Sequence, residues 1–221
     1  MPKSKVIFIT ATDTGVGKTV AVYALGLLLQ KQGINVGVMK PVQCAGNDVQ
    51  LLKKALSLDD DIKLMNPFFA PEPLSPHLAF NRAKIKFNKE RVQDCLSQLR
   101  QRHDVVLVEG AGGFMVPITP GYYMADLIAD LKAEMIIVAR PGLGTINHTL
   151  LTINEAKRRR LPLMGTVFCQ TGPGAQGLPE KTNALAIEEL SGVQSLGMIP
   201  YLKPLNRENV LRRCHNLKLN V

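Results

Sequence analysis

The segment TATDTGVGKT, residues 10–19, decides the fold, because it carries the groups that a phosphate-binding loop needs. It follows a short apolar run and precedes a helix-like segment, so the order is strand, loop, helix. Gly15 and Gly17 can adopt the positive φ angles with which such a loop turns its amide groups toward a phosphate. Lys18 can reach the outer phosphates, and the hydroxyl of Thr19 can bind Mg²⁺. The segment therefore predicts a nucleotide-binding loop.

One position departs from the usual pattern of this loop, G-x-x-x-x-G-K-[ST]. Thr12 stands where the first glycine is expected, but Ala11, one place earlier, is small enough to permit the tight turn. The alternative is a strand-turn-helix corner that contains Gly-Lys-Thr by coincidence. The flanking strand and helix favour the phosphate loop over that alternative.

Short β-branched runs recur along the chain between helix-like segments. They are VIFIT at 6–10, NVGVM at 35–39, DVVLVE at 104–109, MIIVA at 135–139, MGTVF at 164–168 and SLGMI at 195–199. Their residues are apolar without strict alternation, as expected for strands covered on both faces. We therefore predict an α/β fold with a doubly wound, mainly parallel sheet and helices on both faces.

Three segments between these runs have their own local signals. KTVAVYALGLLLQKQG (18–33) is apolar nearly all round, so we expect a helix buried against the sheet with Gly33 as its C-terminal cap. Four prolines in PFFAPEPLSP (67–76) predict an extended loop rather than a regular element. TGPGAQGLPE (171–180) is expected to be a mobile loop.

Length and composition limit the class of protein. The 221 residues, 46% of them hydrophobic, can form one sizeable core, and we predict a single domain over 1–221. No apolar stretch approaches the roughly 20 residues that a membrane span needs, and the N-terminus leads into a strand rather than a signal sequence. The 4 cysteines show neither a CxxC pair nor zinc-ligand spacing, so we expect reduced thiols. These features predict a cytoplasmic protein.

The formal net charge of +9 is compatible with nucleic acid, a membrane surface or anionic small ligands. The densest basic run is KRRR at 157–160, and no aromatic residue is interleaved with it. A solvated helix face is the favoured interpretation of such a run. We therefore expect neither a nucleic-acid partner nor a membrane partner.

Two acidic residues are candidates for holding Mg²⁺ beside a bound ATP. Glu109 ends a strand-like run just before the glycine-rich stretch 110–113, which leaves room for phosphate or substrate, although acidic strand ends also occur for structural reasons. Asp48 opens the next helix, where its plain interpretation is a first-turn acid favoured by the helix dipole. Lys40 ends the second strand, and the sequence alone leaves open whether it is functional or simply solvated.

Several segments in order make the chain similar to the dethiobiotin synthetases, ATP-dependent ring-closing enzymes of biotin biosynthesis. The segments are TDTGVGKT, KPVQCAGND, NPFFAPEPLSPH, VEGAGG and GLGTINHTLLT, with IPYL near the end. The resemblance covers residues 6–202, leaves the tail unassigned, and implies a ligase that uses ATP as co-substrate and Mg²⁺ as metal cofactor. It implies that 7,8-diaminopelargonic acid captures CO₂ (or bicarbonate) as a carbamate, which ATP phosphorylates. The second amine then closes a cyclic urea, releasing ADP and phosphate.

The same resemblance implies roles for individual residues. Lys18 and Lys40 would stabilise the carbamate and the transferred phosphoryl group, with Thr14 at the reaction centre. Mg²⁺ would be held by Thr19, Asp48 and Glu109. The implied ATP site comprises Gly15, Val16, Gly17, Lys18, Thr19, Val20, Asp48, Glu109, Gly110, Ala111, Gly112, Cys169, Gln170, Pro200, Tyr201 and Leu202.

The implied substrate site has two parts. Cys44 would lie beside the carbamate, whereas Thr145, Ile146 and Asn147 would begin a helix whose amide groups bind the carboxylate of the substrate. In the family this helix comes from the partner subunit, so the resemblance implies a homodimer with active sites at the interface. The alternative is that Asn147 is an ordinary helix-start residue.

Two departures from the family pattern affect the expected chemistry. Cys44 replaces a small hydroxyl residue and is a weaker hydrogen-bond partner. Cys169 and Gln170 stand where the family offers an asparagine that reads the adenine edge. Either Gln170 takes over that function, or the nucleotide preference is relaxed.

Two other classes of nucleotide-binding protein compete with this interpretation. A ParA/MinD-like switch ATPase would suit the charge of +9, but such proteins carry a lysine early in the loop, where this chain reads TATDTG. An amide-forming synthetase of the cobyrinic acid type would normally carry a glutaminase domain, for which 221 residues leave no room. Neither class accounts for GLGTINH as well as the synthetase interpretation does.

Overall fold

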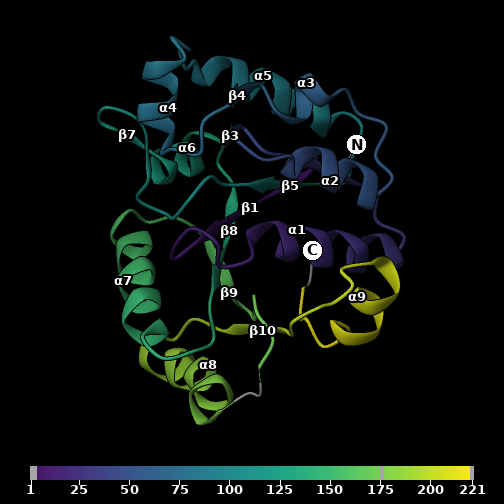
Figure 1. Ribbon diagram of the computed structural model, residues 1–221, viewed down its shortest axis with the longest axis vertical. Coiled ribbons are helices and arrows are strands. Elements are labelled where there is room, and N and C mark those ends of the chain that lie inside the picture. The colour runs from purple at the N-terminus through teal and green to yellow at the C-terminus, as the bar shows by residue number, and fades with distance from the viewer. Residues whose placement is uncertain (1–3, 175–176, 220–221) are drawn as a thin grey trace.

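The central sheet of the computed structural model has six strands, all parallel, within residues 4–174 and 177–219, which are the residues that the structure describes. Their order is β10-β9-β8-β1-β5-β2, so the first strand lies inside the sheet (Figure 1). The strands are β1 (Lys5–Ala11), β2 (Val36–Met39), β5 (Val105–Glu109), β8 (Glu134–Ala139), β9 (Leu163–Cys169) and β10 (Ser195–Ile199). Each strand overlaps one of the six apolar runs, so the predicted doubly wound α/β fold is confirmed.

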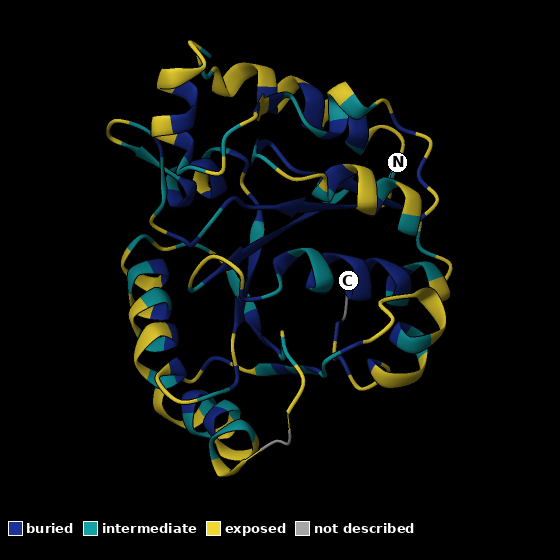
Figure 2. Ribbon diagram, viewed as in Figure 1, coloured by how far each residue is buried: buried dark blue, intermediate teal, exposed yellow. Residues whose placement is uncertain are grey.

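Helices cover both faces of the sheet. Successive side chains of each strand point to opposite faces, so the apolar strands leave two apolar faces that helices must cover. In β1, Ile7 and Ile9 belong to one core and Phe8 to the other. The core around Ile7 is completed by α1 (Lys18–Lys31), α2 (Asp48–Ala55), α3 (Ile62–Met65) and α9 (Arg207–Arg213). The opposite core is completed by α4 (Pro76–Arg82), α5 (Lys89–Arg100), α6 (Met124–Asp130), α7 (Thr145–Arg158) and α8 (Leu178–Ser191). Figure 2 shows the buried strands between these layers in dark blue.

The helix that follows the phosphate loop is buried along most of its length, as its apolar sequence predicts. α1 begins at Lys18, directly after Gly17, whose φ of 98° lies in the left-handed region. Gly33 follows the last turn with a φ of 81°, a conformation that glycine adopts without steric cost. The two glycines therefore mark the ends of α1 as predicted.

Two small sheets extend the fold beside the central one. β3 (Val42–Cys44) pairs in parallel with β4 (Phe68–Ala70), and β6 (Pro117–Thr119) pairs antiparallel with β7 (Tyr122–Tyr123). The prediction that 67–76 contains no regular element was therefore wrong. β4 fits between Pro67 and Pro71, and Pro76 occupies the first turn of α4, where a missing N–H is tolerated.

Two C-terminal segments also differ from expectation. Residues 178–180 form the first turn of α8, so the loop predicted over 171–180 ends earlier, and residues 175 and 176 lie outside the described residues. The tail, to which the sequence assigned no element, forms α9 and packs Val210 into the core around α1. Within the described part of the chain, no helix is both long and apolar enough to cross a membrane.

Candidate active site

The predicted site residues gather at the edge of the sheet where the parallel strands end. The phosphate loop leaves β1, Lys40 follows β2, and Glu109 is the last residue of β5. Because β5 pairs with both β1 and β2, these three ends lie next to one another. In an open parallel sheet, this edge is where ligands bind.

The phosphate loop has the shape that its glycines predict. Gly15 and Gly17 have φ angles of 70° and 98°. Asp13 organises the start of the loop, because its Oδ1 accepts the Thr14 N–H at 2.7 Å and its main-chain oxygen accepts Lys18 Nζ at 3.3 Å. Arg140 Nη2, from the end of β8, donates to Asp13 Oδ2 at 2.9 Å. No sequence motif indicated this support from Arg140.

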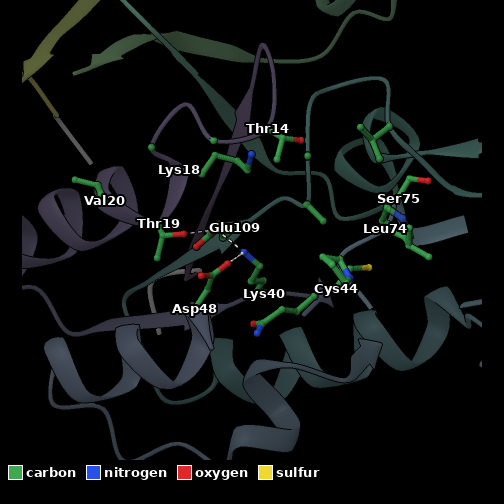
Figure 3. A pocket seen from close by; sticks show the side chains of 18 of the residues that line it. Thr14, Lys18, Thr19, Val20, Lys40, Cys44, Asp48, Leu74, Ser75 and Glu109 are labelled. Carbon is green, nitrogen blue, oxygen red and sulfur yellow. Dashed lines mark hydrogen bonds and ion pairs between the residues drawn. The ribbon is translucent and has the colours of Figure 1, made fainter. Parts of the chain in front are cut away.

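A buried charged centre connects the three strand ends (Figure 3). Lys40 Nζ donates to Asp48 Oδ2 and to Glu109 Oε1, both at 2.5 Å. Thr19 Oγ1 donates to the same Glu109 oxygen at 2.8 Å. Lys40 and Glu109 are only 5% and 1% exposed, so their charges interact with little screening by water. The structure thus resolves the open question about Lys40, which is a buried member of the site and not a solvated strand end.

The two lysines of the site are affected differently by their surroundings. Burial alone would lower the pKa of Lys40, but the carboxylates of Glu109 and Asp48 outweigh it and raise that pKa above its usual value. Burial lowers the pKa of Lys18 to about 8, with Glu109 opposing the shift and Lys40 adding to it. Both side chains are therefore mainly cationic at neutral pH.

The donor set around Glu109 fits Mg²⁺ bound together with a nucleotide. Glu109 Oε2 is buried and has no hydrogen-bond partner, so it is available to a cation. Asp48 and the Thr19 hydroxyl are joined to this carboxylate through the hydrogen bonds described above. Among residues 4–174 and 177–219, no cluster of three or more His, Cys, Asp or Glu side chains could hold a metal by itself. Mg²⁺ typically uses one or two carboxylates and completes its shell with water and phosphate oxygens, which matches this set.

A cavity of about 590 Å³ opens over this centre. Twelve of the predicted residues line it: Thr14, Gly15, Gly17, Lys18, Thr19, Val20, Lys40, Cys44, Asp48, Glu109, Ala111 and Gly112. The remaining lining residues were not predicted as site residues: Gln43, Pro73, Leu74, Ser75, Pro76, Val116 and Thr171. The segment 73–76 lies within a stretch that carries the family resemblance, which was the available signal for it. Gln43 lies within another such stretch, KPVQCAGND at 40–48, which was likewise its only signal.

The predicted base-binding residues lie on the other side of the phosphate loop. Cys169 and Gln170 line a second cavity of about 420 Å³, together with Thr145 and Arg140. Gln170 N–H donates to the Ile199 carbonyl at 2.9 Å, which places the end of β10, and therefore 200–202, beside it. Pro200, Tyr201 and Leu202 line neither cavity in the part of the chain that the structure describes.

Cys169 does not project freely toward a ligand. The thiol is 1% exposed, and a Cβ built on Gly17 would lie 2.4 Å from its sulfur. Burial, with a smaller contribution from Cys214, raises the pKa of Cys169 to about 12. The Gln170 amide donates to the Gly174 carbonyl at 3.0 Å. The side chains expected to read the base are therefore engaged within the protein.

Two predicted ATP-site residues support the loops from behind. Val16 is 1% exposed and packs into the core around α1. A Cβ on Gly110 would lie 2.9 Å from a ring carbon of Phe8, so glycine allows the chain after β5 to approach β1 closely. Neither residue lines the two cavities within the described ranges.

The turn before α7 lies apart from the charged centre of the same chain. Gly144 has a φ of 89°, and Thr145, Ile146 and Asn147 form the first turn of α7 as predicted. Thr145 lines the second cavity, whereas Ile146 and Asn147 line neither cavity among the described residues. Leu143, in the turn, is 95% exposed. The turn therefore shares a cavity with Thr12 and Asp13 at the start of its own phosphate loop. Among the described residues, it does not line the cavity over the charged centre of the same chain.

The basic run 157–160 is partly engaged in ion pairs within the protein. Arg158 and Arg159 both bind Glu155, and Arg159 also binds Asp126 at 2.6 Å. Lys157 Nζ donates to the Ser191 carbonyl. Arg159 thus connects the end of α7 to α6, and Lys157 connects it to α8, while Arg158 stays on the exposed face of α7.

Together, the parallel sheet, the phosphate loop after its first strand and the buried lysine-carboxylate centre define a P-loop nucleotide-binding protein. A family model described as an AAA domain matches residues 5–209. Curated relatives identify the chain more closely: it belongs to the ATP-dependent dethiobiotin synthetases.

Three relatives carry this conclusion, each named ATP-dependent dethiobiotin synthetase BioD. The protein of Nitrosopumilus maritimus is 36% identical, covering 94% of this chain and 94% of its own. That of Methanocaldococcus jannaschii is 40% identical, covering 87% and 92%. That of Bacillus subtilis (strain 168) is 38% identical, covering 92% and 90%.

Solved structures support the fold alone. The cell division ATPase MinD of Pyrococcus furiosus superposes with a TM-score of 0.59 at 18% identity, covering 95% of this chain and 88% of its own. A ParA bound to nonspecific DNA gives a TM-score of 0.56 at 12% identity, covering 97% and 100%. This chain thus shares its architecture with the switch ATPases, while its sequence belongs to the synthetases.

Proposed function

We propose that the chain makes dethiobiotin from 7,8-diaminopelargonic acid, CO₂ and ATP. One amine adds to CO₂ and loses a proton, which forms a carbamate. A carbamate oxygen then takes the γ-phosphoryl group of ATP, and ADP leaves. The second amine attacks the carbonyl carbon, loses a proton and expels phosphate, which closes the cyclic urea. The convergence of Lys18, Lys40, Thr19, Asp48 and Glu109 on one cavity is the observation that carries this proposal.

Positioning and charge stabilisation account for the chemistry, since phosphoryl transfer needs no nucleophilic side chain. The amide groups of the phosphate loop and the ammonium of Lys18 would bind the migrating phosphate. Lys40 would stabilise the charge of the carbamate and then of the mixed anhydride. Thr19, Asp48 and Glu109 would hold Mg²⁺, which when bound neutralises charge on the β- and γ-phosphates. Holding the reactants in one cavity could contribute on the order of 7–11 kcal/mol to lowering the barrier.

The two ends of the diamine would contact different parts of the assembly. Thr14, Cys44 and the segment 110–112 would lie beside the reacting amines, with Ser75 on the same cavity wall. The carboxylate tail would bind the amide groups of Thr145, Ile146 and Asn147 from a partner subunit. Leu143 is exposed, and among the described residues this turn does not line the cavity over its own charged centre, which supports a homodimer with shared active sites. A chain that stays monomeric and fully active would contradict this part of the proposal.

The remaining parts of the proposal concern the setting of the reaction. The residues 200–202 would bind the adenine end of ATP together with Cys169 and Gln170.

We infer a single synthetase domain over 1–221 that works in the cytoplasm, without a nucleic-acid or membrane partner. The ion pairs of Arg158 and Arg159 with acidic residues of the same chain support the absence of a nucleic-acid partner.

Phosphate release from Mg-ATP and bicarbonate, measured with and without 7,8-diaminopelargonic acid, tests the proposal. We expect release that depends on the diamine and a product heavier than the diamine by one carbonyl unit less two hydrogens. Glu134→Gln changes a partly exposed carboxylate that pairs with Lys5 at the edge of the sheet where the strands begin, opposite the charged centre, and serves as a matched control for Glu109→Gln. Release that is indifferent to the diamine would instead favour a switch ATPase.

A further inference from the structure

The turn between β3 and α2 has an unusual backbone that the site depends on. Ala45 and Gly46 have φ angles of 58° and 70°, and Asp48 follows as the first residue of α2. A positive φ is uncommon for alanine and persists only where the surroundings stabilise it. The position of Asp48, one of the two partners of Lys40, therefore depends on whatever fixes this turn.

Gln43 provides that stabilisation from inside the protein. Its Nε2 donates to the Ala45 carbonyl at 3.2 Å and to the Gly46 carbonyl at 2.9 Å. Its Oε1 accepts the Val49 N–H at 3.3 Å. Gln43 is 1% exposed, so these hydrogen bonds have little competition from water.

The contact with Val49 replaces an ordinary helix cap. Asn47 is the N-cap residue of α2, and asparagine is among the best residues at that position, yet its side chain makes no capping hydrogen bond. Gln43 instead accepts the N–H of the second helical residue. The same side chain thus holds both the turn and the first turn of α2, with Asp48 between the two contacts.

We propose that Gln43 is a positioning residue for the metal side of the active site, acting through Asp48. It keeps the Asp48 carboxylate within reach of Lys40 and of the place for Mg²⁺ beside Glu109. Gln43 therefore strengthens the binding of Mg-ATP but not of ATP alone, which the phosphate loop and Lys18 bind. The inference rests on the proposed function, because it deepens the role of Asp48 in that site.

Nucleotide binding measures this effect without turnover. Methylanthraniloyl-ATP is titrated into wild type and Gln43→Met, once with excess Mg²⁺ and once with EDTA. We expect Gln43→Met to weaken binding about tenfold with Mg²⁺, as for the loss of buried hydrogen bonds, and less than about twofold with EDTA. Gln43→Asn retains an amide on a shorter side chain, so its affinity for the nucleotide with Mg²⁺ should lie between those of wild type and Gln43→Met. This milder variant also keeps the test decisive if Gln43→Met does not fold.

Gln30→Met is a matched control. Gln30 Nε2 donates to the Leu56 carbonyl at 2.9 Å, so it holds the opposite end of the same helix. Loss of this hydrogen bond should leave binding unchanged with Mg²⁺ and with EDTA. An equal loss of Mg²⁺-dependent binding in Gln30→Met would mean that α2 as a whole, not Gln43, places Asp48, and would overturn the inference.

A double variant tests whether Gln43 acts through Asp48. Asp48→Asn should remove the Mg²⁺-dependent gain in affinity, and adding Gln43→Met should then cost nothing further. Additive losses would overturn the inference. If Mg²⁺ does not strengthen binding even in wild type, the metal assignment in the proposed function fails and the inference falls with it. Diamine-dependent turnover is a separate readout, so the two failures are distinguishable.

Discussion

The two ends of the nucleotide site are built in opposite ways. At the phosphate end, Lys40 and Thr19 both donate to one buried carboxylate, Glu109. At the base end, the Cys169 thiol is hidden beneath Gly17, and the Gln170 amide is held by Gly174. The first region presents charged side chains to its ligand, whereas in the second the Cys169 thiol is buried and the Gln170 amide is bonded to the main chain.

This difference indicates where selectivity resides. Side chains that converge on the phosphates and metal can discriminate strongly between ligands, because a ligand without the matching group leaves a buried charge without a partner. A base end whose two candidate side chains, Cys169 and Gln170, are engaged within the protein can discriminate only weakly between bases. We therefore expect substitutions at the phosphate end to have large effects and changes at the base end, in protein or nucleotide, to have smaller ones.

The largest effect is expected for Lys40→Met. It removes a cation from the proposed reaction centre and leaves the buried Glu109 without its ammonium partner. We expect kcat to fall by about 10²–10³, as for the loss of a group that stabilises transition-state charge. Steady-state kinetics measures the loss, with Lys54→Met, an exposed change on α2, as control.

The same variant has a predictable pH dependence. A cation beside the substrate amine lowers the pKa of that amine and favours its free base. Without Lys40 the pKa of the amine rises, so carbamate formation should shift to higher pH. Trapping the carbamate across a pH series checks the direction, and an unchanged profile would show that Lys40 does not act on the amine.

A smaller effect is expected where the two regions touch, at Gly17. Alanine there combines a φ of 98° with a Cβ only 2.4 Å from Cys169 Sγ, whereas alanine at Gly15 has a φ of 70° and nothing within 4 Å. We expect Gly15→Ala to lower the free energy of unfolding by about 1–2 kcal/mol and Gly17→Ala by more. Denaturant unfolding measures both values.

Cys169→Ala tests whether the thiol causes the larger destabilisation by Gly17→Ala. In a Cys169→Ala background, the extra cost of Gly17→Ala over Gly15→Ala should shrink, because the 2.4 Å contact with Sγ is lost and only the looser 3.0 Å contact with the Cβ of residue 169 remains. If the extra cost persists in full without the thiol, the contact with Sγ is not its source.

Nucleotide preference should show a still weaker effect. Since Cys169 is buried and the Gln170 amide is engaged, we expect the kcat/KM values for ATP, CTP and GTP to lie within about tenfold of one another, a difference of about 1.4 kcal/mol. Competition kinetics with the three nucleotides measures this ratio. A preference for ATP by several orders of magnitude would show that the main chain or 200–202 reads the base strongly.

The smallest effect is expected for the rates at which the thiols react with a reagent, which differ between the two regions already in the wild-type protein. Cys44 is half-buried in the cavity, whereas Cys95, Cys169 and Cys214 are buried. Burial raises the pKa of Cys44 as well, but that of Cys169 reaches about 12 and that of Cys214 about 11. A thiol-specific reagent at pH 8 should therefore modify Cys44 first, and Mg-ATP with the diamine should slow the reaction. Cys44→Ser should abolish the fast phase, and rapid native-state labelling of Cys169 would contradict the description of the base end.

The sequence predicted the sheet better than the connections around it. The six strands were visible because parallel strands buried on both faces leave continuous apolar runs. β4 was missed because the prolines around 68–70 suggested a loop, although they flank the strand and do not interrupt it. α9 was missed because only Val210 and a few neighbours of its amphipathic sequence face the core.

Three members of the charged centre were predictable from local signals, whereas Lys40 and Asp48 needed the family resemblance and the supporting residues were not predicted. Lys18, Thr19 and Glu109 occur next to strand ends and glycines, and these local signals are strong. Gln43 and Arg140 act on main-chain or side-chain atoms that only the folded chain brings near them. The orientation of Cys169 likewise depends on how β9 packs beneath Gly17, which no local pattern encodes.

The pairing of two lysines with two carboxylates has an electrostatic consequence for the free protein. Lys18, Lys40, Asp48 and Glu109 carry opposite charges in equal number around one cavity, so these four side chains balance one another without a counter-ion from solution. A lone divalent cation or a lone nucleotide would each bring unmatched charge into this poorly solvated space. Metal and nucleotide entering as one complex bring far less, and such a centre favours the complex over its separate components.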